Sequence, residues 1–178
     1  GANPIRQPLD NLNGAGSLYG AIIYQKAPIV MRQLELLMGE DAFREGLREY
    51  LKTYAFRNAT WADLVALLDS RTAVDLVAWS RAWVEEPGRP DIATELSVRE
   101  GAIARLQVRQ SDPRGRALVW PQSLRVDVGW PEGVKSYTVS LATAVAEVPE
   151  VVGLPTPLWV LPAGGGLGYG AFALDPAT

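Results

Sequence analysis

The feature that most constrains the fold of this chain is a change in the spacing of its apolar residues near residue 90. Before this point they recur every three to four positions, as on one face of a helix. After it they alternate with polar or small residues, as in half-buried strands. Residues 85–90, Glu-Glu-Pro-Gly-Arg-Pro, separate the two patterns with residue types that interrupt regular structure. The sequence therefore predicts an α+β chain with a helical segment at 1–90 and a β domain at 91–178.

The helical segment is predicted to contain about four helices. From Leu18 to Leu37 apolar residues fall at helical spacing, and Gly39 is the residue type that most often ends a helix in a left-handed conformation. Pro28 lies inside this stretch, so the helix either begins only a few residues before it or is kinked there. The apolar face of a second helix consists of Phe43, Leu47, Tyr50 and Leu51. The two helices are expected to form a hairpin.

Two short motifs indicate where the other helices begin. Thr60 and Asp63 have the spacing of a capping box, in which each side chain accepts a hydrogen bond from the other residue's backbone N–H. Thr72 and Asp75 have the same spacing and predict the start of a fourth helix. Because each helix has one apolar face, the helices must cover one another or form the wall of a larger domain.

Alternation predicts six or seven short strands in residues 91–178. Its apolar members are Leu96 and Val98, Leu106 and Val108, Leu118 and Trp120, Leu124 to Trp130, Tyr137 to Leu141, and Trp159 and Leu161. This number of strands favours an antiparallel, immunoglobulin-like β-sandwich. The glycine-rich stretch at 163–170 is interpreted as a turn between strands, because no helix follows it that could bind a phosphate.

Composition excludes several kinds of chemistry. The 178 residues contain neither histidine nor cysteine, so this sequence cannot form a Ser-His-Asp or Cys-His catalytic group, a disulfide or a histidine-ligated metal site. The net charge is -3, and Lys and Arg form no stripe of the kind that binds a phosphate backbone, so no nucleic-acid partner is expected. No apolar run approaches the roughly 20 residues that cross a bilayer, so no membrane segment is expected.

The first 90 residues also contain an ordered series of short motifs. They are Tyr24-Gln25-Lys26, Leu37-Met38-Gly39-Glu40-Asp41-Ala42-Phe43, Gly46-Leu47, Tyr50-Leu51, Asn58-Ala59-Thr60, Asp63-Leu64, and Trp83 before Pro87-Gly88-Arg89-Pro90. This series resembles the zinc aminopeptidases of the aminopeptidase N type, a family of metallopeptidases. The sequence departs from the family at Ala27 and Pro28, where Gly-Ala is usual, and at Met38, where Leu is usual.

The resemblance implies a zinc-dependent hydrolase that removes N-terminal residues from peptides. It implies that Tyr24 is the catalytic tyrosine, whose phenol donates a hydrogen bond to the oxyanion formed when zinc-bound water attacks the scissile carbonyl. The family's His-Glu-x-x-His motif and downstream Glu have no counterpart here, and in the family they precede the point where this sequence begins. We therefore expect a fragment without a cofactor of its own and inactive alone, with the C-terminal part of the catalytic domain at 1–90 and the β-sandwich that follows it at 91–178.

Two alternatives remain open from the residues themselves. Tyr24 fits the apolar face of an amphipathic helix, where it would be a core residue. The whole chain fits a non-enzymatic module, a helical segment with an immunoglobulin-like sandwich, that binds a protein or a glycan. The fragment hypothesis makes a further prediction: an apolar face of the helices, covered in the intact protein by the remainder of the catalytic domain, is exposed here and drives self-association.

Overall fold

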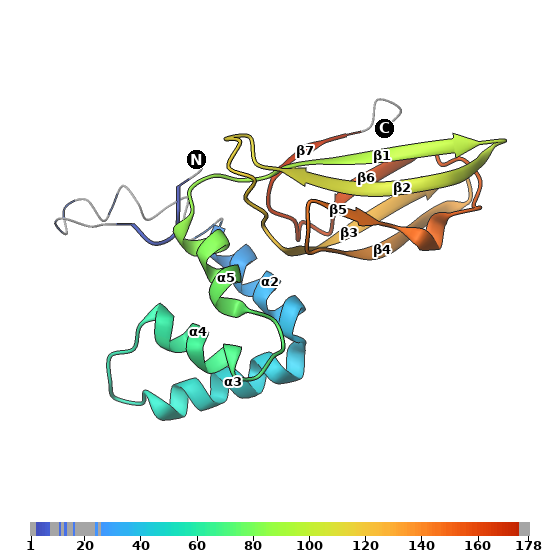
Figure 1. Ribbon diagram of the computed structural model, residues 1–178. Helices are drawn as coiled ribbons and strands as arrows, with labels where there is room; N and C mark the ends of the chain where they lie inside the picture. The colour runs from blue at the N-terminus through green and yellow to red at the C-terminus, as the bar shows by residue number, and fades with distance from the viewer. Residues whose placement is uncertain are drawn as a thin grey trace. The chain divides into compact units, whose positions relative to one another are not determined.

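The computed structural model describes residues 3–7, 11, 13, 16, 24 and 26–174. These residues form two compact units, one extending to Pro87 and the other beginning at Gly88. The first, here called the helical unit, contains four described α-helices, and the second, the β unit, contains two sheets (Figure 1). The prediction of an α+β chain with about four helices followed by strands is confirmed. Among the described residues, no helix combines the length and apolarity that crossing a bilayer requires.

The first two helices follow the local signals in the sequence. Helix α2 spans Ala27–Met38 with Pro28 at its second position, where a helix tolerates proline because the first N–H groups of a helix have no partner within it. It ends at Gly39, which has a φ of 84°. Helix α3 spans Glu40–Thr53. The predicted helical residues from Leu18 to Ile23 lie outside the described residues.

The two later helices confirm one cap and correct the other. Helix α4 spans Trp61–Asp69, and the capping box of Thr60 and Asp63 is present with both hydrogen bonds. Helix α5 spans only Leu76–Ser80, and its cap is Asp75, whose carboxylate accepts the N–H of Ala78 at 2.8 Å. The predicted box of Thr72 and Asp75 is therefore wrong. The Thr72 hydroxyl instead accepts the N–H of Val74 at 3.2 Å, in the turn that precedes the helix.

A π-helical turn, η3 (Arg81–Glu85), follows α5 and carries the centre of the helical core. Trp83 is fully buried and stacks on Trp79 with ring centroids 5.6 Å apart. The side chains of Leu34, Leu68 and Leu76 are also almost fully buried. Each of these three lies on a different helix, so the core joins α2, α4 and α5.

The β unit contains seven described strands in two sheets. The strands are β1 (Asp91–Arg99), β2 (Ala102–Ser111), β3 (Gln122–Trp130), β4 (Gly133–Leu141), β5 (Val145–Glu147), β6 (Trp159–Gly164) and β7 (Ala171–Ala173), with a 3₁₀ turn, η4 (Pro149–Val151), after β5. One sheet has the order β5-β2-β1-β7 and the other β4-β3-β6. All pairs are antiparallel except β1 with β7, which is parallel, so the purely antiparallel prediction is wrong at one edge.

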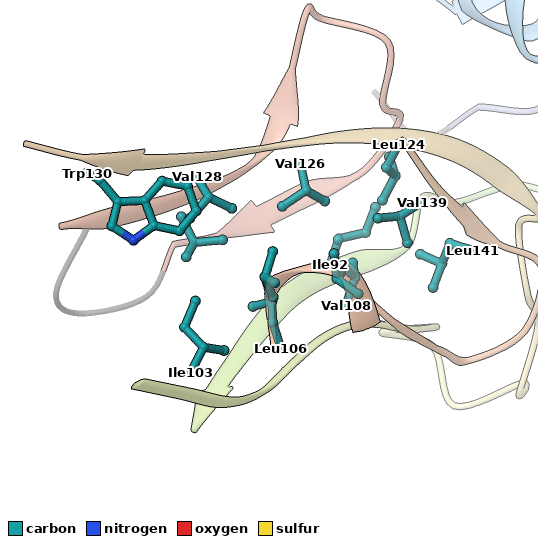
Figure 2. Close-up of a cluster of buried hydrophobic side chains, with 13 residues drawn as sticks. Ile92, Ile103, Leu106, Val108, Leu124, Val126, Val128, Trp130, Val139 and Leu141 are labelled. Atoms are coloured by element: carbon teal, nitrogen blue, oxygen red, sulfur yellow. The ribbon is translucent and has the colours of Figure 1, made fainter. Parts of the chain in front are cut away.

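The side chains between the sheets form one core. Figure 2 shows residues of both sheets filling the space between them, among them Ile92 and Val108 from one sheet and Val126 and Val128 from the other. All four of these side chains have no measurable exposure to solvent. A shared core of this kind makes the two sheets a single sandwich.

Two strand predictions are corrected. Leu118 and Trp120 form no strand, because Ala117 has a φ of 56°, outside the extended region, and Pro121 lacks the N–H that a ladder needs. Trp120 is nevertheless fully buried, and its backbone N–H donates to the Gln110 side chain at 3.0 Å. The short strands β5 and β7 were not predicted. The glycine-rich stretch before β7 forms the turn between β6 and β7, as expected.

Candidate active-site segment around Tyr24

Tyr24 lies in a helical turn just before α2 and projects toward solvent. The backbone is π-helical at Tyr24 and again at Lys26, and α2 begins at Ala27. The Tyr24 side chain is 70% exposed, so in this chain it is not a core residue of an amphipathic helix. A phenol in this position is accessible to a ligand from the solvent side.

Lys26, two residues further on, is buried. It is only 5% exposed, and burial lowers the pKa of its amine from 10.5 to about 8. The physical cause is that a charged ammonium loses its hydration in the protein interior. The Lys26 Nζ donates to the backbone oxygen of Asn3 at 3.5 Å. The buried side chain therefore links the start of α2 to the segment 3–7.

The segment 3–7 is in turn attached to the π-helical turn η3. The Arg6 N–H donates to the Val84 oxygen at 2.9 Å, and the Arg6 guanidinium lies 3.5 Å from the Glu85 carboxylate. The Gln7 side chain donates to the Pro4 oxygen at 2.9 Å. These contacts join the residues around Tyr24 to a part of the chain about 60 positions away in sequence.

An apolar groove of about 530 Å³ lies in the same unit and reaches the first turn of α2. Its apolar lining comes from Ile5, Ala27, Val30, Met31, Trp61, Ala62 and Val84. The Trp61 indole N–H donates to the buried Ser80 hydroxyl at 2.7 Å, which fixes the ring at the start of α4. Two of the lining residues, Ala27 and Val30, lie in the first turn of α2, which directly follows the turn that carries Tyr24.

The residues of this chain do not fit a zinc site. Catalytic zinc is held by histidine, cysteine and carboxylate side chains converging on one point. The sequence has no histidine or cysteine, and within the described ranges no three acidic side chains gather closely enough to hold a metal.

Comparison with known proteins assigns the helical unit to a family. Residues 1–83 match the peptidase family M1 domain. Aminopeptidase N of Streptomyces lividans is 29% identical over 189 residues, which cover 97% of this chain and 22% of that protein. The helical unit belongs to peptidase family M1. Aminopeptidase N of Lactobacillus helveticus is 26% identical over 71% of this chain and 16% of that protein, so the chain spans about a fifth or less of these relatives.

A solved structure supports the same relationship at the level of the fold. The crystal structure of Legionella pneumophila aminopeptidase A superposes on 82% of this chain and 17% of that protein, with a TM-score of 0.59 and 17% identity. Because the coverage exceeds the M1 segment at 1–83, the fold similarity extends into the β unit.

Tyr24 was predicted from the sequence, but the burial of Lys26 was not. The signal was present in the spacing, because Lys26 lies four, seven and eight positions before Val30, Gln33 and Leu34, the buried residues of α2. These offsets mark one face of a helix. A lysine at the beginning of such a series predicts an amine on the buried face.

Lys26→Met is expected to remove part of the pH dependence of stability in the M1 segment. The amine has a folded pKa of about 8 and an ordinary value of 10.5, so in this pH window the unfolded chain binds the proton and the folded chain does not. Stability therefore rises with pH across the window, by ~3 kcal/mol for the full shift. In Lys26→Met this rise is lost.

Denaturant unfolding followed by far-UV circular dichroism, at about pH 8 and about pH 10, measures the effect. The wild-type chain and Lys26→Met share all other titrating groups. The difference between their changes in stability with pH therefore measures the contribution of Lys26. An equal change in stability for both proteins would show that the amine is not desolvated.

Proposed function

We propose that this chain is the C-terminal part of the catalytic domain of an M1 zinc aminopeptidase, together with the β-sandwich domain that follows, and that the intact enzyme hydrolyses N-terminal residues from peptides. The observation that carries this proposal is the match of residues 1–83, with Tyr24 inside it, to the peptidase family M1 domain. We assign residues 1–90 to the catalytic domain and 91–178 to the sandwich. The division of the chain between Pro87 and Gly88 is in keeping with this assignment.

Tyr24 is assigned the role of oxyanion donor in the intact enzyme. A neutral phenol O–H aimed at the scissile carbonyl oxygen gains most when negative charge develops there, so it stabilises the transition state more than the ground state. The 70% exposure of the Tyr24 side chain is compatible with contact to a substrate. The zinc ligands are assigned to a part of the intact protein that precedes this sequence.

The β unit is assigned an immunoglobulin-like sandwich architecture. Its two sheets around one core and its strand number are typical of that class. The parallel pairing of β1 with β7 makes β7 an edge strand of the four-stranded sheet. The unit contributes no residue to the catalysis proposed here.

The helical unit is assigned a partner surface for the remainder of the catalytic domain. Large apolar side chains project to solvent from its helices and loops, including Leu51, Phe56 and Val77. Phe56 is fully exposed and has a φ of 60°, a strained value for a side chain of this size. We expect these residues to be covered in the intact enzyme and to promote self-association of the isolated chain. No observation favours the alternative of a non-enzymatic protein- or glycan-binding module.

The proposal is tested by comparing this chain with a version extended upstream in its gene until a His-Glu-x-x-His motif is included. The extended protein is expected to hold one zinc per chain and to cleave aminoacyl anilides, because it supplies the missing ligands. The 178-residue chain is expected to do neither. Metal analysis and anilide hydrolysis measure both. An upstream region without the motif, or zinc-dependent hydrolysis by the short chain, would overturn the proposal.

A further inference from the structure

We propose that Lys26 is a positioning residue that holds Tyr24 in its solvent-facing orientation, an inference that rests on the proposed role of Tyr24. Lys26 does not reach the reacting atoms in this scheme. It acts through the turn that carries the tyrosine. Its effect is therefore on how often the phenol occupies its productive orientation.

The side chains of Tyr24 and Lys26 point to opposite sides of the helical turn. In a helical backbone, residues two positions apart project roughly 200° apart around the axis. Lys26 is 5% exposed and Tyr24 is 70% exposed, as this geometry requires when one of them points inward. Lys26 also continues the buried face formed by Val30, Gln33 and Leu34. Burial of Lys26 therefore fixes the rotation of the turn, and the rotation directs Tyr24 outward.

The turn before α2 is attached to the segment 3–7 through the Lys26 side chain. The start of α2 has no side-chain cap hydrogen bond and no acidic residue in its first turn. The Lys26 Nζ instead donates to the Asn3 oxygen at 3.5 Å. The segment containing Asn3 is attached to Val84 through the Arg6 N–H. The lysine thus connects the start of α2 to η3 through the segment 3–7.

Lysine is an unusual residue at a position as buried as residue 26. An apolar side chain of similar length would fill the same space without the cost of dehydrating an amine. Burial lowers the pKa of Lys26 to about 8, which reflects that cost. The property that distinguishes lysine here is its ability to donate a hydrogen bond at the end of a long side chain. The contact between Lys26 Nζ and the Asn3 oxygen depends on this hydrogen-bond donor.

The test is a double-mutant cycle in the extended, zinc-containing enzyme, with Tyr24→Phe, Lys26→Met and the double variant. Lys26→Met is expected to lower kcat about 10-fold and to change KM by less than about twofold. The reason is that a misdirected phenol stabilises the transition state less but leaves substrate binding unchanged. In the Tyr24→Phe background, where no phenol remains to be positioned, Lys26→Met is expected to cause no further loss. Zinc content is expected to be unchanged throughout.

A purely structural role gives a different result. If Lys26→Met lowers kcat by the same factor in both backgrounds, or lowers it in neither, Lys26 does not act through Tyr24. Lys26→Leu removes the same amine with a different shape and goes through the same cycle, which keeps the test decisive if the methionine variant folds poorly. If Tyr24→Phe itself leaves kcat unchanged, the proposed role of Tyr24 fails, and this outcome is separate from a failure of Lys26 alone.

Discussion

In the extended enzyme, Tyr24→Phe is expected to lower kcat by roughly 10² to 10³, with little change in zinc content. The substitution removes one hydrogen-bond donor to the oxyanion, and such donors contribute about 2.7–4 kcal/mol to transition-state stabilisation. Tyr24 is 70% exposed in this chain, so the loss of its hydroxyl is expected to cost little stability. The measurement is steady-state anilide hydrolysis, together with metal analysis of the same samples.

Tyr50→Phe is the matched control. Tyr50 lies in the same unit, on α3, with its ring 5.1 Å from that of Tyr54, and it has no part in the proposed chemistry. Its loss of a hydroxyl is expected to leave kcat within about twofold of the wild-type value. A Tyr24→Phe enzyme as active as this control would remove Tyr24 from the mechanism.

Trp83→Ala is expected to destabilise the helical unit by about 3–5 kcal/mol, the range for removing a large aromatic side chain from a core. Trp83 is fully buried and stacks on Trp79 with centroids 5.6 Å apart, so truncation removes this stacking and leaves a cavity in the core. Denaturant unfolding of the 178-residue chain, followed by far-UV circular dichroism, measures the loss. A cost of this size is comparable to the whole stability of a small domain.

Val77→Ala provides the comparison for that measurement. Val77 lies on the neighbouring helix α5 and is 61% exposed, so its truncation is expected to change stability by less than about 0.5 kcal/mol. If Trp83→Ala unfolds at the same denaturant concentration as Val77→Ala, the stacked tryptophans do not contribute the stability expected of a core pair.

The helix ends that could be predicted from sequence are those set by residues within one turn. Gly39 ends α2 and the box of Thr60 and Asp63 begins α4, because the deciding hydrogen bonds join neighbours in sequence. The same reasoning chose the wrong partner for Asp75. A threonine three residues before an acid also fits an isolated turn, and in this chain Asp75 itself caps the helix.

Features set by distant residues could not be predicted in this way. Strand β7 is only three residues long and follows a run of glycines, so its own sequence gives no alternation, and its place is defined by pairing with β1. The orientation of Tyr24 is a similar case. The motif identified the residue, but its exposure depends on the burial of Lys26 and on the contact of Lys26 with Asn3, 23 positions away.

The pairing of β1 with β7 has a consequence for how the protein is made. Residues Asp91 to Ala93 align with Ala171 to Ala173, so β1 has no second neighbour until residues 171–173, much further along the sequence, have left the ribosome (Figure 1). During that interval one side of β1 presents open backbone donors and acceptors, the kind of surface on which nascent chains aggregate. A chain shortened before residue 171 is therefore expected to leave this edge of β1 unpaired and to aggregate more readily than the longer chain.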